Sequence, residues 1–292
     1  MRNPFLGSGV ALVTPFNDDL TIDFTALRAL VRYQIDNGTD FLVVQGTTGE
    51  SPTLSKAEKF EVLRAVQEEN AGQLKIVFGV GGNNTIEVGE TLKSLPAGID
   101  GILSVSPYYN KPTQKGIIEH YKYISACTEL PIILYNVPGR TGSNVLPATT
   151  VELSKINNIV AVKEASGDMV QIMSLVRDRP EGFGILSGDD AITMPLIAAG
   201  IDGVISVVAN AFPKRFGDMI HSGMNGDVQN SKKEHYELLH VTNLFFAEGN
   251  PGGVKASLHK QGLMKPIMRQ PLYPISDELR LEIESETVRL LS

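Results

Sequence analysis

A lysine at the end of an apolar run carries the clearest chemical signal in the sequence. The run 159–162, Ile-Val-Ala-Val, leads directly into Lys163. Burial in such a run disfavours the charged ammonium, and a neutral amine can attack a carbonyl carbon to form an imine. The structural alternative is a lysine that reaches the rim of the fold or pairs with an acid such as Glu164, and the apolar run leaves both interpretations open. Alternation along a strand places Lys163 on the same face as Ala161 and opposite Glu164.

Two polar residues lie near the end of the preceding apolar run, 131–137, and shortly after it. Tyr135 lies near its end, one strand away from Lys163, and a phenol there could relay protons to and from an imine. Arg140 lies in a loop flanked by proline and glycine, where its guanidinium could bind a carboxylate through two parallel hydrogen bonds. A tyrosine that caps the core and an arginine on the surface are the structural alternatives. Two more tyrosines, Tyr108 and Tyr109, follow the run 101–107 at the same rim.

The segment 46–51, Gly-Thr-Thr-Gly-Glu-Ser, suits a small carboxylate. Its two glycines let a ligand approach the backbone, and the hydroxyls of Thr47 and Thr48 add donors to the exposed amide groups. It is not a phosphate-binding loop, because no Gly-Lys-Ser/Thr follows. A simple Gly-Thr turn is the structural alternative.

Other sequence features give little support for a metal or an organic cofactor. The single cysteine, Cys127, excludes an internal disulfide and any site built from several thiolates. The segment 79–84, Gly-Val-Gly-Gly-Asn-Asn, departs from the dinucleotide-binding fingerprint, and the pair Asp189 and Asp190 is thin support for magnesium. The five histidines lie in predicted helical stretches without metal-ligand spacing: His120, His221, His235, His240 and His259. We therefore expect no metal and no cofactor.

Eight short apolar runs must position these residues. They begin at residues 9, 41, 75, 101, 131, 159, 183 and 203, and they are rich in Val, Ile and Leu, which is typical of parallel strands covered on both faces. Amphipathic helical patterns lie between them, and Asp23 and Ser55 stand where helix N-caps belong. Eight such units close a (β/α)8 TIM barrel, whose chemistry lies at the carboxyl ends of the strands. A doubly wound open sheet is the alternative, but it would place a glycine fingerprint after the first run, and residues 10–19 have none. We predict an α/β fold with a (β/α)8 barrel.

After about residue 226 the strand pattern stops. Three helical stretches follow, with a proline-rich stretch before the last one, and no low-complexity linker precedes them. We therefore predict a catalytic barrel over residues 1–226 and a C-terminal helical appendix over residues 227–292, packed on the barrel or on a partner subunit.

The composition of the 292 residues is that of an ordinary soluble protein, with 42% hydrophobic and 20% charged residues. The 26 Lys and Arg residues against 33 Asp and Glu residues leave a net charge of −7, which argues against a nucleic-acid or anionic-membrane surface. No apolar stretch approaches the roughly 18 residues of a membrane span, and the first residues do not resemble a signal peptide. The sequence therefore predicts a cytoplasmic enzyme.

Six rim segments together resemble the dihydrodipicolinate synthase and N-acetylneuraminate lyase family of pyruvate-dependent aldolases. They occur in family order and at family spacing from about residue 5 to the C-terminus: GTTGES at 46–51, SPYYNKP at 106–112, LYNVPGRTG at 134–142, VKEASGD at 162–168, LSGDD at 186–190 and GVISVVAN at 203–210. The double threonine and the arginine are similar to the synthase branch, since the lyase branch usually has Ser-Thr in the first segment and lacks that arginine. The resemblance implies a TIM barrel in which Lys163 is the nucleophile.

The resemblance also implies an activity. Pyruvate would condense with Lys163 to a covalent Schiff base, and its enamine would attack the aldehyde of L-aspartate 4-semialdehyde. Cyclisation would release 4-hydroxy-tetrahydrodipicolinate, an intermediate of the diaminopimelate route to L-lysine. No further cofactor is implied, and the partners are these two small molecules and, by family expectation, other copies of the chain in a tetramer built as a dimer of dimers.

Site roles follow from the resemblance residue by residue. Thr47 and Thr48 would hold the carboxylate of pyruvate, and Arg140 would hold that of the semialdehyde. Tyr135, Thr47 and Tyr109 would form a proton relay, with Tyr109 lent by the neighbouring subunit. Gly188 and Ile205 would complete the substrate-binding set.

Regulated family members bind lysine at a subunit interface, and the resemblance places that site at a set of matching positions: Ser51, Pro52, Lys56, Lys59, Asn83, Glu87 and Tyr108. Glu87 could pair with the ammonium of a ligand, but Lys56 stands where the lysine-sensitive enzymes carry histidine. A fixed cation there repels a dicationic amino acid. We therefore expect lysine to inhibit weakly or not at all, unless these lysines are simply exposed helix residues.

One segment departs from the family pattern Asn-Pro-x-Pro-Val-Lys. Residues 250–255 read Asn-Pro-Gly-Gly-Val-Lys, and we expect the loss of the second proline to loosen the start of the following helix without touching a catalytic position. Two alternatives to the synthase remain: another pyruvate-dependent lyase acting on N-acetylneuraminate or a keto-sugar acid, and a catalytically silent ligand-binding paralogue.

Overall fold

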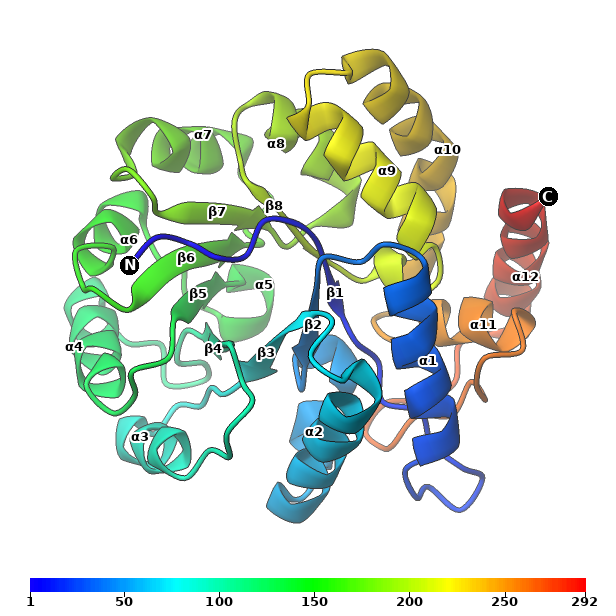
Figure 1. The fold of residues 1–292 in the computed structure, drawn as a ribbon, viewed down its shortest axis with the longest axis horizontal. Helices are drawn as coiled ribbons and strands as arrows, with labels where there is room; N and C mark the ends of the chain where they lie inside the picture. Colours follow the sequence, from blue (N-terminus) through cyan, green and yellow to red (C-terminus); the bar gives the residue numbers. More distant parts are fainter. The chain divides into compact units, whose positions relative to one another are not determined.

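Eight parallel strands form a closed barrel in the computed structural model, which describes residues 1–292 (Figure 1). The strands follow one another around the barrel in chain order, so the predicted (β/α)8 topology is confirmed. Their bounds are β1 (Gly7–Ala11), β2 (Phe41–Val44), β3 (Lys75–Gly79), β4 (Gly101–Val105), β5 (Ile132–Asn136), β6 (Ile159–Glu164), β7 (Gly184–Ser187) and β8 (Gly203–Ser206).

Helices follow the strands, and the predicted caps begin two of them. The Asp23 carboxylate accepts a hydrogen bond from the Ala26 amide at the start of α1, and Ser55 and Glu58 form a reciprocal capping box at the start of α2. The helix bounds are α1 (Phe24–Asp36), α2 (Lys56–Asn70), α3 (Thr85–Lys93), α4 (Gln114–Ser125), α5 (Pro138–Thr141), α6 (Pro147–Leu153), α7 (Met169–Asp178), α8 (Thr193–Ala198), α9 (Pro213–Met224), α10 (Val228–Ala247), α11 (Gly252–Lys260) and α12 (Asp277–Leu291). Short 3₁₀ helices are η1 (Thr47–Gly49), η2 (Ser51–Thr53), η3 (Asp190–Ile192) and η4 (Val208–Asn210). None of the helices is both long and apolar enough to cross a membrane.

The chain divides into two compact units. The first unit comprises Met1–Gly7 and Ile76–Ile205, and the second comprises Ser8–Lys75 and Ser206–Ser292. The predicted C-terminal helices are present in the second unit as α10, α11 and α12. The division of the chain at residue 226 stays a prediction.

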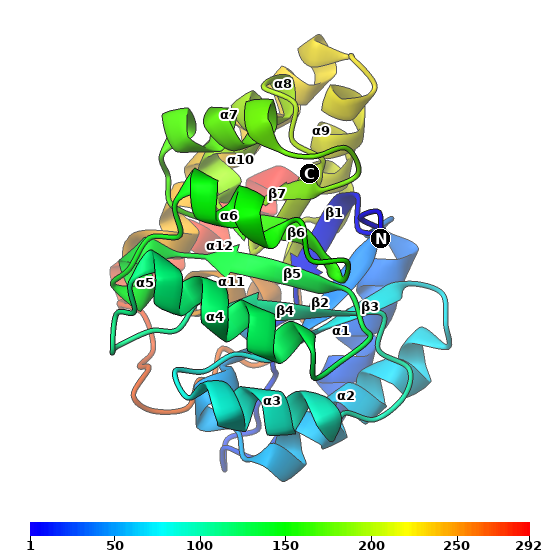
Figure 2. The same ribbon diagram turned by 90° about the vertical axis from the view of Figure 1, so that its left-hand side faces the viewer.

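In the first unit, the register of four strands places the candidate residues at one level. Tyr135 on β5 pairs with Lys163 on β6, Val105 on β4 pairs with Tyr135, and Leu186 on β7 pairs with Lys163. The helices pack in sequence around these strands, α3 against α4, α4 against α6, α6 against α7 and α7 against α8 (Figure 2). Paired residues of parallel strands project to the same face, so the register brings the phenol and the amine together.

In the second unit, α11 packs tightly against α10. A Cβ atom added at Gly253 would lie 2.6 Å from the Cα atom of Phe245, so only glycine permits this approach. A Cβ atom at Gly252 would lie 2.7 Å from the Ile275 side chain, and residues 252–258 of α11 are all buried. The glycines therefore permit close packing of this helix start, and the expected loosening relative to the family proline stays a prediction.

Candidate active site

Lys163 is a buried amine without an ionic partner. Only 6% of its surface is exposed, and its Nζ atom lies 4.6 Å from the centroid of the Tyr135 ring. The amine forms no ion pair and no hydrogen bond with a residue of the chain, so the alternative in which it pairs with Glu164 is not realised. A buried amine without an ionic partner is a candidate nucleophile toward a carbonyl carbon.

Glu164 projects to the opposite face of β6, as the alternation predicted. Its carboxylate accepts hydrogen bonds from Asn136 Nδ2 at 3.1 Å, the Ser166 amide at 2.8 Å and Gln171 Nε2 at 3.2 Å. Burial raises the pKa of Glu164, and these hydrogen bonds oppose that shift. Glu164 therefore joins β5, β6 and α7 behind the strand that carries Lys163.

Gly188 leaves room for the stem of Lys163. A Cβ atom at residue 188 would lie 2.8 Å from the Lys163 Cε atom and 2.8 Å from the Ala165 Cβ atom. The Gly188 amide donates to the Glu164 carbonyl at 2.8 Å, which fixes this approach. Ile205 is buried on β8, and its role in substrate binding stays a prediction.

Arg140 is exposed on the short helix α5, and its guanidinium forms no hydrogen bond and no ion pair. Its five donors are therefore open to an external anion. The stem of Lys111 lies against the end of the same helix, since a Cβ atom at Gly142 would lie 2.7 Å from the Lys111 Cε atom. The loops after β4 and β5 thus meet next to Arg140.

Tyr108 and Tyr109 lie in the loop that follows β4. Tyr109 is 87% exposed and has a left-handed backbone conformation, with φ at 71°. Asn110 Nδ2 donates to the Asn83 carbonyl at 3.1 Å and ties this loop to the segment before α3. The Tyr109 side chain is therefore accessible to another molecule, and its role stays a prediction.

In the second unit, η1 follows β2 and carries Thr47 and Thr48. Thr48 is buried, Thr47 is half-buried, and the Gly49 carbonyl accepts a hydrogen bond from Thr14 Oγ1 at 2.7 Å. Asn250 Nδ2 donates to Thr48 Oγ1 at 3.0 Å. Sequence reasoning missed this contact, although the segment 250–255 had drawn attention by its departure from the family pattern.

Glu50, the residue after Gly49 in this loop, belongs to a buried ion pair. Glu50, in a left-handed conformation with φ at 54°, pairs with Lys255 of α11, and both side chains are fully buried. Lys255 Nζ also donates to the carbonyls of Thr14 and Ile267 at 2.8 Å and lies 4.5 Å from the Phe16 ring centroid. Burial lowers the pKa of Lys255 to about 8, and the Glu50 carboxylate opposes the shift.

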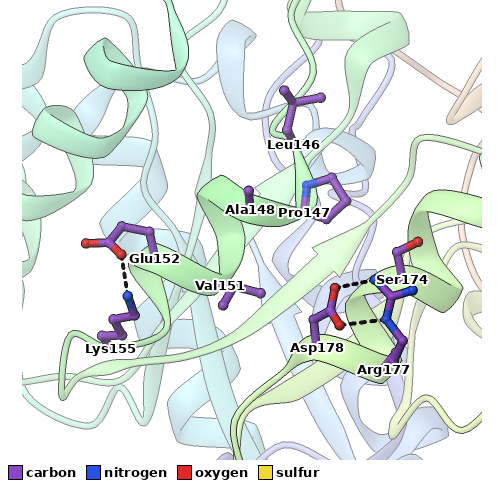
Figure 3. Close-up of a pocket in the computed structure, with 9 residues that line it drawn as sticks. All are labelled: Leu146, Pro147, Ala148, Val151, Glu152, Lys155, Ser174, Arg177 and Asp178. Carbon is purple, nitrogen blue, oxygen red and sulfur yellow. Dashed lines mark hydrogen bonds and ion pairs between the residues drawn. The ribbon is translucent and has the colours of Figure 1, made fainter.

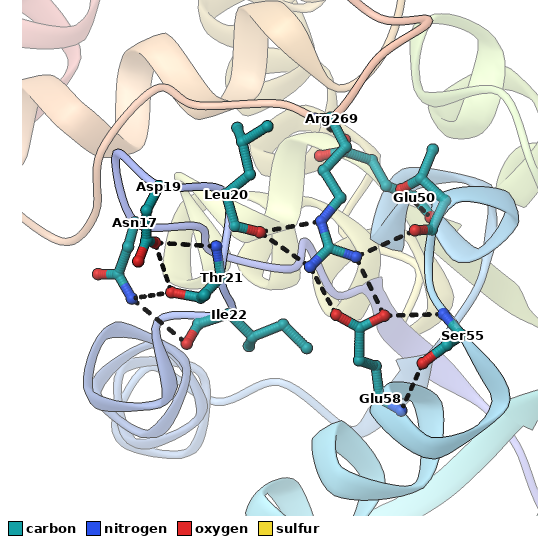
Figure 4. A network of polar contacts seen from close by, with 10 residues as sticks. Asn17, Asp19, Leu20, Thr21, Ile22, Glu50, Ser55, Glu58 and Arg269 are labelled. Carbon is teal, nitrogen blue, oxygen red and sulfur yellow. Dashed lines mark hydrogen bonds and ion pairs between the residues drawn. The ribbon is translucent and has the colours of Figure 1, made fainter.

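Arg269 completes the network around Glu50 (Figure 4). Its backbone amide donates to the second Glu50 oxygen at 3.0 Å, and its guanidinium lies 4.7 Å from the Phe16 ring. The guanidinium also binds Glu58 at 2.6 Å and the Leu20 carbonyl at 2.8 Å. The Arg269 guanidinium, aided by the amide of the Ser55 cap, lowers the pKa of Glu58 to about 2. The segment 250–269 therefore holds the loop that contains Thr48 from several sides.

The positions matched to a lysine site are divided between the two units. The first unit contains Asn83, Glu87 and Tyr108, and all three are exposed. The second unit contains Ser51, Pro52, Lys56 and Lys59. Lys56 Nζ lies 5.9 Å from the centroid of the Phe60 ring, and burial lowers the pKa of Lys59. That these positions form one site stays a prediction.

A separate groove of about 640 Å³ lies between α6 and α7 (Figure 3). Leu146, Pro147, Ala148 and Val151 supply its apolar lining, and the ion pairs Glu152–Lys155 and Arg177–Asp178 flank it. None of the candidate catalytic residues lines this groove.

Comparisons with known proteins agree on one family. A family model described as the dihydrodipicolinate synthetase family matches residues 4–289. A 4-hydroxy-tetrahydrodipicolinate synthase from Flavobacterium psychrophilum is 46% identical over 288 residues, which cover 98% of each chain. The crystal structure of a dihydrodipicolinate synthase from Aquifex aeolicus superposes with a TM-score of 0.95 at 39% identity, covering 98% of both chains. A chloride-inhibited dihydrodipicolinate synthase from Acinetobacter baumannii, solved with pyruvate, has a TM-score of 0.94 at 39% identity, covering 96% of this chain and 97% of that one.

Proposed function

This chain belongs to the dihydrodipicolinate synthetase family, and on that premise we propose how its residues carry out the reaction. The chain is an enzyme of the lyase class with 4-hydroxy-tetrahydrodipicolinate synthase activity, which serves lysine biosynthesis. Its substrates are pyruvate and L-aspartate 4-semialdehyde, and the reaction proceeds through a Schiff base on the protein. The assignment of steps to individual residues is our proposal.

Lys163 is the nucleophile. Its neutral amine adds to the carbonyl carbon of pyruvate, and loss of water gives the imine. Loss of a methyl proton then gives the enamine, whose carbon attacks the semialdehyde aldehyde and forms the new carbon–carbon bond. The amino group of the added substrate attacks the imine carbon, closes the ring and returns the free amine to Lys163. The observation that carries this assignment is the buried, unpaired Nζ atom, 4.6 Å from the Tyr135 ring centroid.

The remaining residues bind the substrates and move protons. Tyr135 relays protons to and from the imine, together with Thr47 and with Tyr109 of a neighbouring copy. Thr47 and Thr48 bind the carboxylate of pyruvate, and the unpaired guanidinium of Arg140 binds that of the semialdehyde. Gly188 gives the Lys163 stem its space, as its contact distances support, and Ile205 contributes to the substrate site.

We further propose the surroundings of this reaction. The covalent imine on Lys163 acts as the electron sink when the methyl proton is lost. The reaction therefore needs no metal and no organic cofactor. The chain works as a homotetramer, built as a dimer of dimers, in the cytoplasm.

Borohydride trapping tests the nucleophile. Reduction in the presence of pyruvate should fix a stable adduct on the peptide that contains Lys163, as peptide mass mapping detects. A Lys163→Ala variant should form no adduct and retain less than about a tenth of the turnover. A Lys155→Ala variant serves as the control, because Lys155 is an exposed lysine in the turn that follows α6. An adduct without turnover of the semialdehyde would instead indicate another pyruvate-dependent lyase. The absence of any adduct would indicate a ligand-binding protein without catalytic activity.

Feedback by L-lysine should be weak. Lys56 places a cation where a dicationic amino acid would bind, and like-charge repulsion of about 1 kcal/mol lowers affinity by roughly 5-fold. Half-inhibition by lysine should therefore need more than about 1 mM, measured with saturating semialdehyde and pyruvate near its KM. Stronger inhibition by wild type would contradict the role of Lys56, and a Lys56→His variant should gain sensitivity.

A further inference from the structure

The hydrogen bond between Asn250 and Thr48 has a defined direction. Asn250 Nδ2 donates to Thr48 Oγ1 at 3.0 Å, and both side chains are more than nine-tenths buried. A threonine hydroxyl has one hydrogen and two lone pairs, so an oxygen that accepts from Asn250 keeps its hydrogen for another acceptor. Thr48 donates that hydrogen to no residue of the chain. A buried hydroxyl hydrogen without an acceptor is costly, which points to an external acceptor in the working enzyme.

The loop that carries Thr48 is held in place around this contact. The residue after it, Gly49, accepts a hydrogen bond from Thr14, and the next residue, Glu50, is bound by Lys255 and by the Arg269 amide. Lys255 and Arg269 belong to the same C-terminal segment as Asn250. The segment thus fixes both the backbone of the loop and the side chain of Thr48, while Gly253 lets α11 reach its position against α10.

We propose that Asn250 is a positioning residue for pyruvate: by donating to Thr48 Oγ1, it turns the Thr48 hydroxyl hydrogen toward the pyruvate carboxylate. The proposal rests on the proposed function of Thr48 as a carboxylate ligand. Asn250 itself touches no reacting atom. Its contribution is a hydroxyl that is already oriented before pyruvate arrives, and a hydrogen bond from an oriented donor to a carboxylate is among the strong ones.

Reversal of the bond direction is the sharpest test. An Asn250→Asp variant has nearly the same shape, but its carboxylate accepts the Thr48 hydrogen instead of donating to the oxygen. The pyruvate KM should rise about 10- to 100-fold near pH 8, the range expected for loss of a hydrogen bond to a charged group. Near pH 5.5, where a buried carboxyl regains its proton and can donate again, a large part of that rise should disappear. The semialdehyde KM should change little at either pH.

A double-mutant cycle separates positioning from general damage. Thr48→Val removes the hydroxyl and should itself raise the pyruvate KM; Asn250→Ala should raise it in wild type but add nothing in the Thr48→Val background. Asn70→Ala is the matched control, because Asn70 is a buried asparagine of the same unit whose side chain binds only the backbone of Leu74. It should lower the melting temperature without changing the pyruvate KM.

The outcomes distinguish the two claims. If Thr48→Val leaves the pyruvate KM unchanged, the carboxylate role of Thr48 is wrong and the positioning role falls with it. If Thr48→Val raises the pyruvate KM but the effect of Asn250→Ala adds to it in the double variant, only the positioning role of Asn250 is overturned. The same conclusion follows if Asn250→Asp binds pyruvate like wild type at both pH values. Borohydride trapping at saturating pyruvate, retained in every variant, shows that the Lys163 site is intact.

Discussion

Gly188 controls how Lys163 extends from its strand. With a Cβ atom 2.8 Å from Lys163 Cε, a Gly188→Ala variant must displace the lysine stem or the strand end. We expect kcat to fall about 10- to 100-fold, because small misplacements of a reacting group cost that much, while the fold persists. Gly217→Ala in α9 is the control, since its Cβ atom would meet no atom closer than 3.8 Å. Equal effects of the two variants on kcat would contradict the role of Gly188.

Arg140 should govern the second substrate only. Arg140→Ala removes the unpaired guanidinium, so the semialdehyde KM should rise about 10- to 100-fold through loss of a charge-assisted bond. Arg140→Lys should recover part of this loss, since it restores the charge but not the bidentate geometry. Steady-state kinetics with each substrate varied give the two KM values, and the pyruvate adduct trapped by borohydride should be unchanged. A selective loss of pyruvate binding would show that Arg140 binds the carboxylate of pyruvate and not that of the semialdehyde.

At the residue scale, the sequence was informative where local pattern decides geometry. Lys163, Tyr135 and Glu164 follow from strand alternation and from the order of neighbouring strands, and the structure places them as expected. Asn250 could not be found in this way. Its partner Thr48 lies 202 residues earlier in the chain, and the contact depends on how α11 packs against α10. Contacts between distant side chains are set by tertiary packing, which periodicity does not encode.

At the scale of elements, His120 joins α4 to α3. Its Nδ1 atom shares a hydrogen bond of 2.8 Å with Thr85 at the start of α3, and its Nε2 atom is buried without a partner. Burial lowers the pKa of His120 to about 4, from an ordinary value of 6.5. Between these two values the unfolded chain binds more protons than the folded one, so the free energy of unfolding falls as the pH falls through this window.

The expected loss is about 2 kcal/mol at pH 5 relative to pH 8. A His120→Asn variant can keep the bond to Thr85 but does not titrate, so its stability should depend less on pH by that amount. Urea unfolding at the two pH values measures the difference. His221 is the contrast, because its hydrogen bond to Asp40 raises its pKa and its contribution is lost as the pH rises. If His120→Asn and wild type lose equal stability between pH 8 and pH 5, the histidine is not responsible.

The elements themselves were largely predictable. Continuous Val, Ile and Leu runs gave all eight strands, because parallel strands covered on both faces need such runs. The four 3₁₀ helices and the short α5 were not predicted, since a turn of three or four residues has no periodicity to detect. The tight packing of α11 was also missed, because the glycines that permit it were interpreted as a loss of rigidity.

For the whole molecule, the closed topology followed from counting strand and helix units, which number eight in both sequence and structure. The division of the chain into two compact units could not be predicted from the number of strands. The second unit combines most of β1 and all of β2 with the C-terminal helices, and within it Lys255 and Arg269 bind groups in the segment 14–58. A boundary drawn where the strand pattern stops could not reveal these long-range ion pairs.

The assembly of copies can be tested through Tyr109. This side chain is 87% exposed and lies in a left-handed turn, so it is well placed to reach another copy. Tyr109→Phe and Lys163→Ala should each be nearly inactive alone. In a mixed dimer, however, the subunit that keeps Lys163 would receive an intact Tyr109 from its partner, and one site of two would work. Random mixing gives half mixed dimers, so co-expression of the two variants should restore about a quarter of wild-type activity.

The measurement is the specific activity of the co-purified mixture, compared with that of the two variants mixed after separate purification. No recovery in the co-expressed sample would mean that Tyr109 acts within its own subunit, because a residue acting in cis cannot complement the lysine of another chain.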